Sequence, residues 1–183
     1  MKHYLSCLLV LSTVLCLAQK RAIPVDTMVV TTHTTTIKNK SINYKATTGT
    51  QPVWNEKGEP IAALYYTFYE RTNTNNTNER PLIISFNGGP GSASVWMHIA
   101  YTGPKVLNLD SEGYPIQPYG VSDNPNSILD IADIVYVNPV HTGYSRMIPD
   151  SKGELPKRDT FFGINADIKY LAEWINTFVS RKG

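Results

Sequence analysis

The sequence predicts an α/β fold, and three observations support this class. Two apolar segments, at 60–70 and 81–86, have the composition of β-strands, and a third lies at 131–140. A long segment with helical spacing of apolar residues, 159–183, follows the third strand. Strands that alternate with longer connections and helices are typical of a sheet with parallel strands.

The first two strands differ in character. PIAALYYTFYE (60–70) is apolar and aromatic, and the polar, asparagine-rich stretch after it predicts a surface turn. PLIISF (81–86) is apolar on both faces, which is typical of a central strand covered by helices. Because the connection is short, we expect these two strands to form an antiparallel hairpin that opens the sheet.

The second half of the chain predicts a short helix, an irregular excursion, a strand and a long helix. VWMHIA (95–100) begins a helix that Gly103 and Pro104 end early, and 103–127 is rich in turn-forming residues. IADIVYVNPV (131–140) is the third buried strand. In the final helix, one face is expected to pack on the sheet through Phe161, Ile164, Ile168, Leu171, Ile175 and Phe178.

The N-terminus predicts a secretory signal peptide over residues 1–18. Lys2 and His3 precede an apolar run that is too short to span a membrane comfortably, and Ala18 precedes the expected cleavage site. We therefore expect an exported protein without a membrane anchor after cleavage. It would be secreted or periplasmic, or vacuolar or lysosomal if the source is eukaryotic.

Composition narrows the function classes. Both cysteines, Cys7 and Cys16, lie in the predicted signal, so the mature chain offers no disulfide, no thiol nucleophile and no thiolate metal ligand. We expect neither a metal nor a cofactor. The formal charge of +2 is too small to indicate a nucleic-acid partner. The sequence does not indicate an oligomeric state.

Two further segments follow the predicted signal. Residues 19–50 are rich in Thr, Asn and Lys and predict a leader. Alternating apolar residues at Ile42, Tyr44 and Ala46 indicate that part of it could form an edge strand. The folded domain is then expected over 51–183.

The most unusual stretch is SFNGGPGSAS (85–94), a glycine-rich loop directly after a predicted strand. A phosphate-binding loop needs a lysine that is missing here, and Gly88, Gly89 and Gly91 have the wrong spacing for a dinucleotide loop. The loop that supplies an oxyanion-hole N–H in α/β-hydrolases remains. Position and composition alone leave this open against a tight turn shaped by Pro90.

The loop resembles the NGGPG signature of the serine carboxypeptidase family. Three other stretches are similar to that family: TGP (102–104), YVNPVHTGYSR (136–146) and DIKYLAEWINTF (167–178). The resemblance covers about residues 50–183. It implies the N-terminal portion of an α/β-hydrolase fold, an incomplete, mixed and mostly parallel sheet with flanking helices.

The resemblance also implies roles for three loop residues. Gly89 corresponds to the glycine whose N–H forms half of the oxyanion hole. The Asn87 side chain and the Gly88 N–H correspond to the groups that bind the terminal carboxylate of a peptide. The implied substrates are therefore the C-termini of peptides or proteins.

Several positions depart from the family pattern. Phe86 stands where tryptophan is frequent, Ser92 where cysteine is frequent, and Tyr101 where many members have an acidic residue. His141 replaces a glycine. Neither His141 nor His98 is expected to be the catalytic base, because the family's histidine lies near the C-terminus.

The nucleophile is expected outside these 183 residues. The family's serine lies in a GESYG segment after the helix that corresponds to 160–180, and no G-x-S-x-G occurs here. The implied function is a secreted serine-type carboxypeptidase that acts through an acyl-enzyme, with this chain alone inactive. The alternatives are an esterase or acyltransferase that uses the same serine, or a truncated product that does not catalyse.

Overall fold

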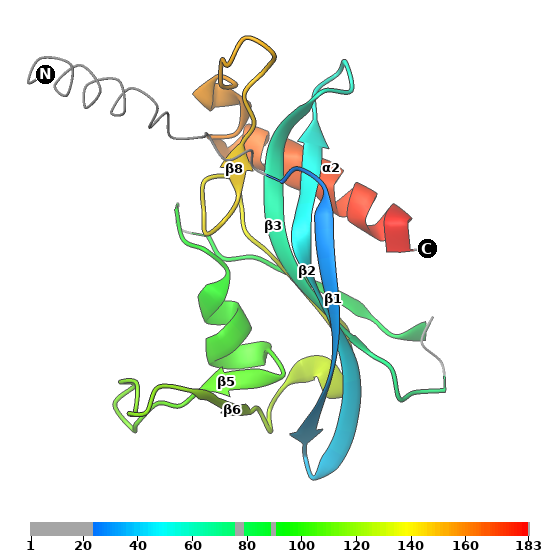
Figure 1. The fold of residues 1–183 in the computed structure, drawn as a ribbon, viewed down its shortest axis with the longest axis vertical. Coiled ribbons are helices and arrows are strands. Elements are labelled where there is room, and N and C mark those ends of the chain that lie inside the picture. The colour runs from blue at the N-terminus through cyan, green and yellow to red at the C-terminus, as the bar shows by residue number, and fades with distance from the viewer. Residues whose placement is uncertain (1–23, 76–78, 89–90, 183) are drawn as a thin grey trace, which may run out of the picture.

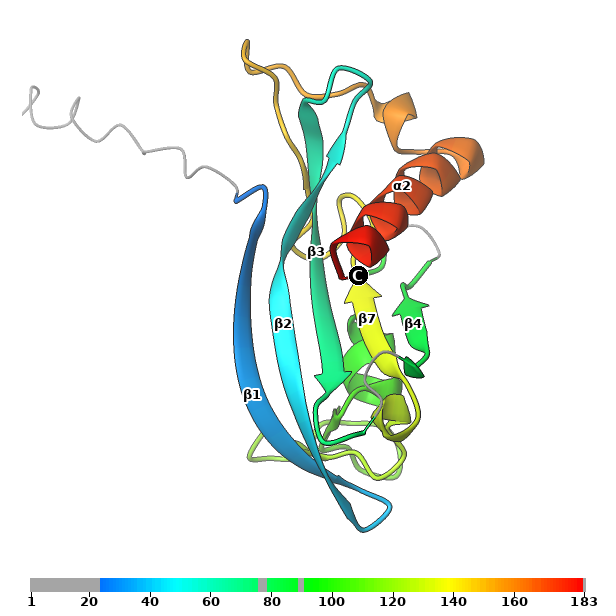
Figure 2. The same cartoon turned by 90° about the vertical axis from the view of Figure 1, so that its right-hand side faces the viewer.

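The computed structural model describes residues 24–75, 79–88 and 91–182. The predicted signal peptide, residues 1–18, lies outside the described residues. The main feature is a twisted six-stranded sheet in which five strands follow the order β1-β2-β3-β7-β4 and β8 pairs with β3 (Figures 1 and 2). The strands are β1 (Thr27–Ile37), β2 (Lys40–Trp54), β3 (Pro60–Arg71), β4 (Leu82–Ser85), β7 (Asp133–Val137) and β8 (Arg146–Met147).

The segment expected to be a leader forms most of a long hairpin. β1 and β2 pair antiparallel from Thr27 opposite Thr50 to Ile37 opposite Lys40. Ile42 and Tyr44 face the core with 0% and 3% exposure, while threonine and valine suit the pleated, exposed positions. β1 is the edge strand, and the boundary expected at residue 50 lies inside β2.

The prediction that 60–70 and 81–86 pair as an antiparallel hairpin is wrong. β3 pairs antiparallel with β7, and β4 lies on the far side of β7, to which it is parallel. Every residue of β7 is buried, so this strand takes the central position and separates β3 from β4. β4 is instead an edge of the described sheet, where Leu82 and Ile83 are each 36% exposed.

The sheet is mixed, as predicted, but its described part is mostly antiparallel. β4 and β7 are the one parallel pair among the described strands, since the hairpin strands and β8 all pair antiparallel. This follows from chain order, because parallel pairing begins only with β4. Segment 81–86, predicted as the second strand of an opening antiparallel hairpin, is instead the strand that runs parallel to β7.

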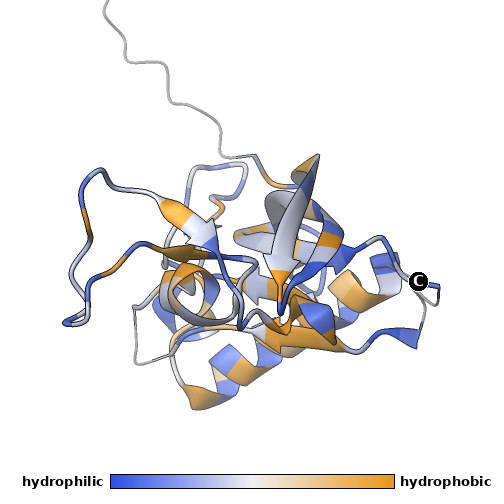
Figure 3. Ribbon diagram, turned by 90° about the horizontal axis from the view of Figure 1, so that it is seen from below, coloured by the Kyte–Doolittle hydropathy of each residue, from blue (hydrophilic) through white to orange (hydrophobic). Residues whose placement is uncertain are grey.

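Helix α2 (Ile164–Lys182) covers one face of the sheet (Figure 2). The buried side chains are Tyr170, Leu171, Trp174 and Phe178, and Phe178 packs edge-on against Tyr66 at 5.4 Å. Figure 3 shows hydrophobic and hydrophilic residues alternating along the helix.

The buried face of α2 differs from the predicted one, and the helix begins later. Phe161, Leu171 and Phe178 are buried as expected, and Ile175 packs partly buried against the core. Ile164 and Ile168, by contrast, are 82% and 62% exposed. The large rings of Tyr170 and Trp174 occupy the core and turn the helix away from these isoleucines. The start is delayed because residues 158–160 form the short helix η4 (Arg158–Thr160).

The opposite face carries the π-helix η2 (Trp96–Thr102) and a small two-stranded sheet of β5 (Lys105–Leu107) and β6 (Val121–Asp123). The expected irregular excursion therefore contains a short hairpin (Figure 1). Side chains alternate across β3, so Tyr66 faces α2 while Tyr69 faces η2.

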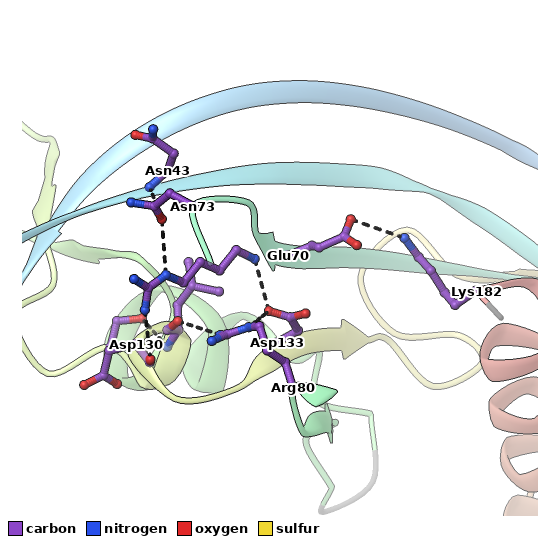
Figure 4. A network of polar contacts seen from close by, with 10 residues as sticks. Asn43, Glu70, Asn73, Arg80, Asp130, Asp133 and Lys182 are labelled. Carbon is purple, nitrogen blue, oxygen red and sulfur yellow. Dashed lines mark hydrogen bonds and ion pairs between the residues drawn. The ribbon is translucent and has the colours of Figure 1, made fainter. Parts of the chain in front are cut away.

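A polar network ties the other ends of the central strands together (Figure 4). Asp133, the first residue of β7, accepts hydrogen bonds from the Arg80 Nε at 2.8 Å and the Arg71 main-chain N–H at 3.0 Å. Arg80 also donates to the main-chain oxygen of Leu129 in η3 (Ile128–Asp130). These bonds tie the segment before β4 to the start of β7 and the end of β3.

Candidate active site

The candidate site lies at the carboxyl ends of β4 and β7. Ser85, the last residue of β4, is paired in register with Tyr136, next to the last residue of β7. Because these strands are parallel and adjacent, the loops after them leave the sheet side by side. Ligands of open α/β sheets bind at this position, outside the carboxyl ends of the strands.

Asn87 is half-buried, and its side chain is oriented within the glycine loop. Its Nδ2 donates a 2.6 Å hydrogen bond to the hydroxyl of Ser92. Because a side-chain amide nitrogen carries two hydrogens, the second can donate to a ligand. The serine that replaces the family's usual cysteine therefore orients the amide predicted to bind a carboxylate.

Ser94 joins the two loops and was not singled out by the sequence. Its hydroxyl accepts a 3.2 Å hydrogen bond from the Asn87 main-chain N–H and donates at 2.5 Å to the main-chain oxygen of Val137. Its main-chain N–H donates to the Oδ1 of Asn138 at 2.9 Å. The side chain is 2% exposed, so this serine is a structural tie between β4 and β7.

The loop after β7 is organised around Asn138. Its main-chain N–H donates to the Tyr65 oxygen at 2.9 Å, and its main-chain oxygen accepts from the Ser145 hydroxyl at 2.7 Å. Gly143 has a φ of 49°, and a Cβ there would lie 2.3 Å from the Nδ2 of Asn138. A polar residue that directly follows a buried strand is the signal that could have found Asn138, whereas Ser94 lies well beyond the end of β4 and carries no such signal.

Gly88 is exposed, and a Cβ added to it would have no neighbouring heavy atom within 4 Å. An incoming group can therefore approach its main chain. Gly89, predicted to supply the oxyanion-hole N–H, and Pro90 both lie outside the described residues. The role of Gly89 stays a prediction.

Three exposed aromatic side chains lie on η2 and in the loop after β7. Trp96 and Tyr101 on η2 are 57% and 62% exposed. In a π-helix, residues five apart lie on the same face, so these two rings share one side of η2. Tyr144, in the loop after β7, is 72% exposed and contacts Tyr65 edge-on at 5.2 Å.

The two histidines near the site differ in their surroundings. His98 is stacked on Tyr136, and its Nε2 lies 2.6 Å from the Tyr69 hydroxyl oxygen. Burial lowers the pKa of His98 to about 4, so the ring is neutral at physiological pH. His141 is exposed, with a φ of 64°. His98 thus packs against the sheet, whereas His141 lies at the surface.

The described residues show neither a metal-binding cluster nor a membrane-spanning helix, and their cavity of about 780 Å³ lies apart from the glycine loop. No cluster of three or more His, Cys, Asp or Glu side chains within 24–75, 79–88 and 91–182 is arranged to hold a metal ion. Among the helices in that part of the chain, none is long and apolar enough to cross a membrane. A cavity of about 780 Å³ lies away from the glycine loop, between the β2–β3 turn and the start of α2, and is lined in part by Trp54, Ile61 and Phe161.

The mixed sheet, its flanking helices and the glycine loop at the strand ends define an α/β-hydrolase-type fold. The chain belongs to the serine carboxypeptidase family, whose model matches residues 37–183. This confirms the membership that the NGGPG motif predicts. It also places the β2 hairpin strand inside the family region.

Individual proteins with similar sequences are consistent with this family. Serine carboxypeptidase S10 family member 1 of Dictyostelium discoideum is 36% identical over 93 residues, which cover 50% of this chain and 20% of that protein. Pheromone-processing carboxypeptidase KEX1 of Saccharomyces cerevisiae is 32% identical over 118 residues, covering 63% and 15%. Putative serine carboxypeptidase-like 30 of Arabidopsis thaliana is 26% identical over 143 residues, covering 78% and 27%.

A solved structure shows the same fold. The crystal structure of Kex1Δp, a prohormone-processing carboxypeptidase from Saccharomyces cerevisiae, matches with a TM-score of 0.56 and 21% identity. The match covers 74% of this chain and 28% of that one. The chain thus spans less than a third of the length of these relatives.

Proposed function

We propose that the complete protein is a serine-type carboxypeptidase that releases residues from the C-termini of peptides. The observation that carries this proposal is the oriented amide of Asn87 beside the open main chain of Gly88. An amide N–H and a main-chain N–H together can hold a carboxylate without a fixed positive charge. Such hydrogen bonds to an ionised acceptor are stronger than neutral ones.

In the proposed reaction, residues 1–183 supply substrate-binding and oxyanion groups, and residues outside this segment supply the nucleophile. A serine hydroxyl supplied from outside residues 1–183 would attack the last peptide carbonyl. The N–H of Gly89 would stabilise the resulting oxyanion. The C-terminal amino acid would leave as the amine, and water would then hydrolyse the acyl-enzyme. In this scheme residues 1–183 alone bind but do not cleave.

We also propose export through the segment 1–18. The basic start, the apolar run and Ala18 support cleavage between Ala18 and Gln19. N-terminal sequencing of the secreted protein should then begin at Gln19. Recovery of an intact Met1 from a membrane fraction would contradict this route. Destinations compatible with export are the medium, the periplasm, the vacuole and the lysosome.

One observation favours a second candidate, an esterase or acyltransferase on the same serine. Tyr101 replaces the acidic residue that many relatives place in the carboxylate-binding network, and it is 62% exposed. A site without that acid has fewer groups to share a proton with a terminal carboxylate. Acyl substrates whose leaving group carries no free carboxylate, such as esters, would then compete with peptides.

The test uses the full-length protein with paired substrates. N-blocked dipeptides with a free C-terminus should be cleaved, while the same peptides with an amidated C-terminus should be cleaved much more slowly. A fluorophosphonate probe should label the full-length protein and not residues 1–183 alone. Equal or better turnover of esters and amidated peptides would favour the second candidate, and a labelled serine within 1–183 would overturn the assignment of the nucleophile.

A further inference from the structure

The π-helix η2 is anchored on the sheet by one of its own side chains, His98. The main chain of this residue is central to the helix. Its N–H donates to the Ser94 oxygen at 3.0 Å, and its oxygen accepts from the Gly103 N–H at 2.9 Å. His98 therefore connects the end of the glycine loop to the end of the helix.

The imidazole packs closely against side chains of two neighbouring strands. Its ring stacks on Tyr136 of β7 with centroids 4.6 Å apart and an interplanar angle of 20°. Its Nε2 lies 2.6 Å from the hydroxyl oxygen of Tyr69 of β3. A Cβ at Gly103 would lie 2.3 Å from the His98 oxygen and 3.2 Å from its Cδ2, so the chain closes tightly over the ring.

Among the described residues, the carboxylates on the elements around His98 have cationic partners of their own: Glu70 pairs with Lys182, Asp133 with Arg80 and Asp123 with Lys105. β3 and β7 contribute the neutral phenols Tyr69 and Tyr136, and η2 itself carries Tyr101 as its other titratable residue. The hairpin packed against η2 brings Lys105, which pairs with Asp123. Burial is accordingly the cause that lowers the pKa of His98, to about 4.

The anchoring of η2 reaches the candidate site through Ser94. This residue accepts the first helical hydrogen bond from His98 and also holds the Asn87 main-chain N–H and the Val137 oxygen. Movement of η2 would thus strain the same serine that positions the glycine loop. It would also move Tyr101, which η2 carries.

We propose that neutral His98 is a positioning residue that fixes η2, and through Ser94 the Asn87 loop, on the sheet, and that proton uptake by its imidazole releases η2. The consequence for catalysis rests on the proposed function. The release of the helix does not.

The direction of the pH effect follows from the pKa of His98 when η2 is packed on the sheet and when η2 is released. In the seated helix the pKa is about 4, whereas a released, solvated histidine has its ordinary value near 6.5. The seated state is therefore fully favoured above about pH 6.5 and loses stability as the pH falls toward 4. Each pH unit in this window shifts the equilibrium toward release by about tenfold.

Hydrogen exchange of the full-length protein tests the proposal. Protection of the amides of residues 96–103, corrected for intrinsic exchange, should fall by roughly fortyfold between pH 6.5 and pH 4.5, because the released ring is already half-protonated at pH 6.5. His98→Phe keeps a ring on Tyr136 but cannot take up a proton, so its protection should not change with pH in this way. His33→Gln, which alters an exposed histidine, should behave as the unaltered protein does.

Unchanged protection across this range, or the same fall in His98→Phe, would overturn the proposal. If that variant does not fold, an NMR titration of the unaltered protein decides, because a folded-state pKa of His98 near 6.5 would also overturn it. Failure to cleave peptides would refute the proposed function without changing the exchange result. In an active protein, His98→Phe should retain kcat/KM on free-carboxylate peptides at pH 4.5 relative to pH 6.5 better than the unaltered protein.

Discussion

The hydroxyl of Ser94 donates a 2.5 Å hydrogen bond to the main-chain oxygen of Val137. This bond joins the loop that leaves β4 to the last residue of the neighbouring parallel strand β7. The same hydroxyl accepts from the Asn87 main-chain N–H, so one buried side chain contacts both the start of the glycine loop and the end of β7.

Ser94→Ala should destabilise the protein. Removing the hydroxyl leaves the Val137 oxygen and the Asn87 N–H without this partner, and an unsatisfied buried group costs about 1–3 kcal/mol. Urea denaturation of the full-length protein measures the loss. Ser92→Ala is the matched control, because Ser92 is half-buried and bonds only the Asn87 side chain among the described contacts. Equal stability of the two variants would show that the hydrogen bonds of the Ser94 hydroxyl do not stabilise the fold.

Asp133→Ala should lower the free energy of unfolding by more than Ser94→Ala does. Asp133 and Arg80 are a nearly buried pair, with side-chain exposures of 12% and 8% and a distance of 2.8 Å (Figure 4). Removing the carboxylate leaves a buried guanidinium unpaired, which costs about 3–5 kcal/mol.

Asp26→Ala is the control for that variant. Asp26 pairs with Arg181 at a similar distance of 2.9 Å, but the side chains are 49% and 44% exposed. Solvent screens such a pair, so the loss should be under about 1 kcal/mol. A similar loss of unfolding free energy in both variants would show that the Asp133 network does not hold the start of β4.

Gly143→Ala should disturb the loop after β7. The alanine must adopt a φ of 49°, and its Cβ would meet the Asn138 amide at 2.3 Å. Gly153→Ala is matched, because its φ is 85° and the space around its Cβ is open. Both variants carry left-handed strain of about 1 kcal/mol, and Gly143→Ala adds the clash. A thermal melt should show the larger drop in Tm for Gly143→Ala, and equal drops would contradict the packing around Asn138.

The sequence predicted the elements better than their arrangement. Apolar composition located the strands near 60–70 and 131–140, and the NGGPG motif located the loop. Neither signal could show that β7 lies between β3 and β4, because strand order depends on pairing between segments that are distant in the sequence. The buried face of α2 was misplaced for a similar reason, since the aromatic rings of Tyr170 and Trp174 fit against Tyr66 only in the assembled core.

The candidate site was predicted in part. The motif singled out Asn87 and Gly88, and the structure places them at the carboxyl end of β4. The supporting residues were not found, because Ser94 and Asn138 are common polar residues whose importance comes from hydrogen bonds between two separate loops. Within 19–50 the sequence indicates a possible strand only at Ile42, Tyr44 and Ala46, because the exposed threonines of β1 show no apolar alternation.

The most direct test of the central claim compares substrates in Asn87→Ala of the full-length protein. If the amide binds the terminal carboxylate, kcat/KM on peptides with a free C-terminus should fall by roughly one to two decades, the equivalent of about 1.5–3 kcal/mol for a hydrogen bond to a charged group. Ester or amide substrates with a blocked terminus do not use that contact and should lose much less. Equal losses on free and blocked substrates, with an unchanged circular dichroism spectrum, would show that Asn87 shapes the loop and does not read the carboxylate.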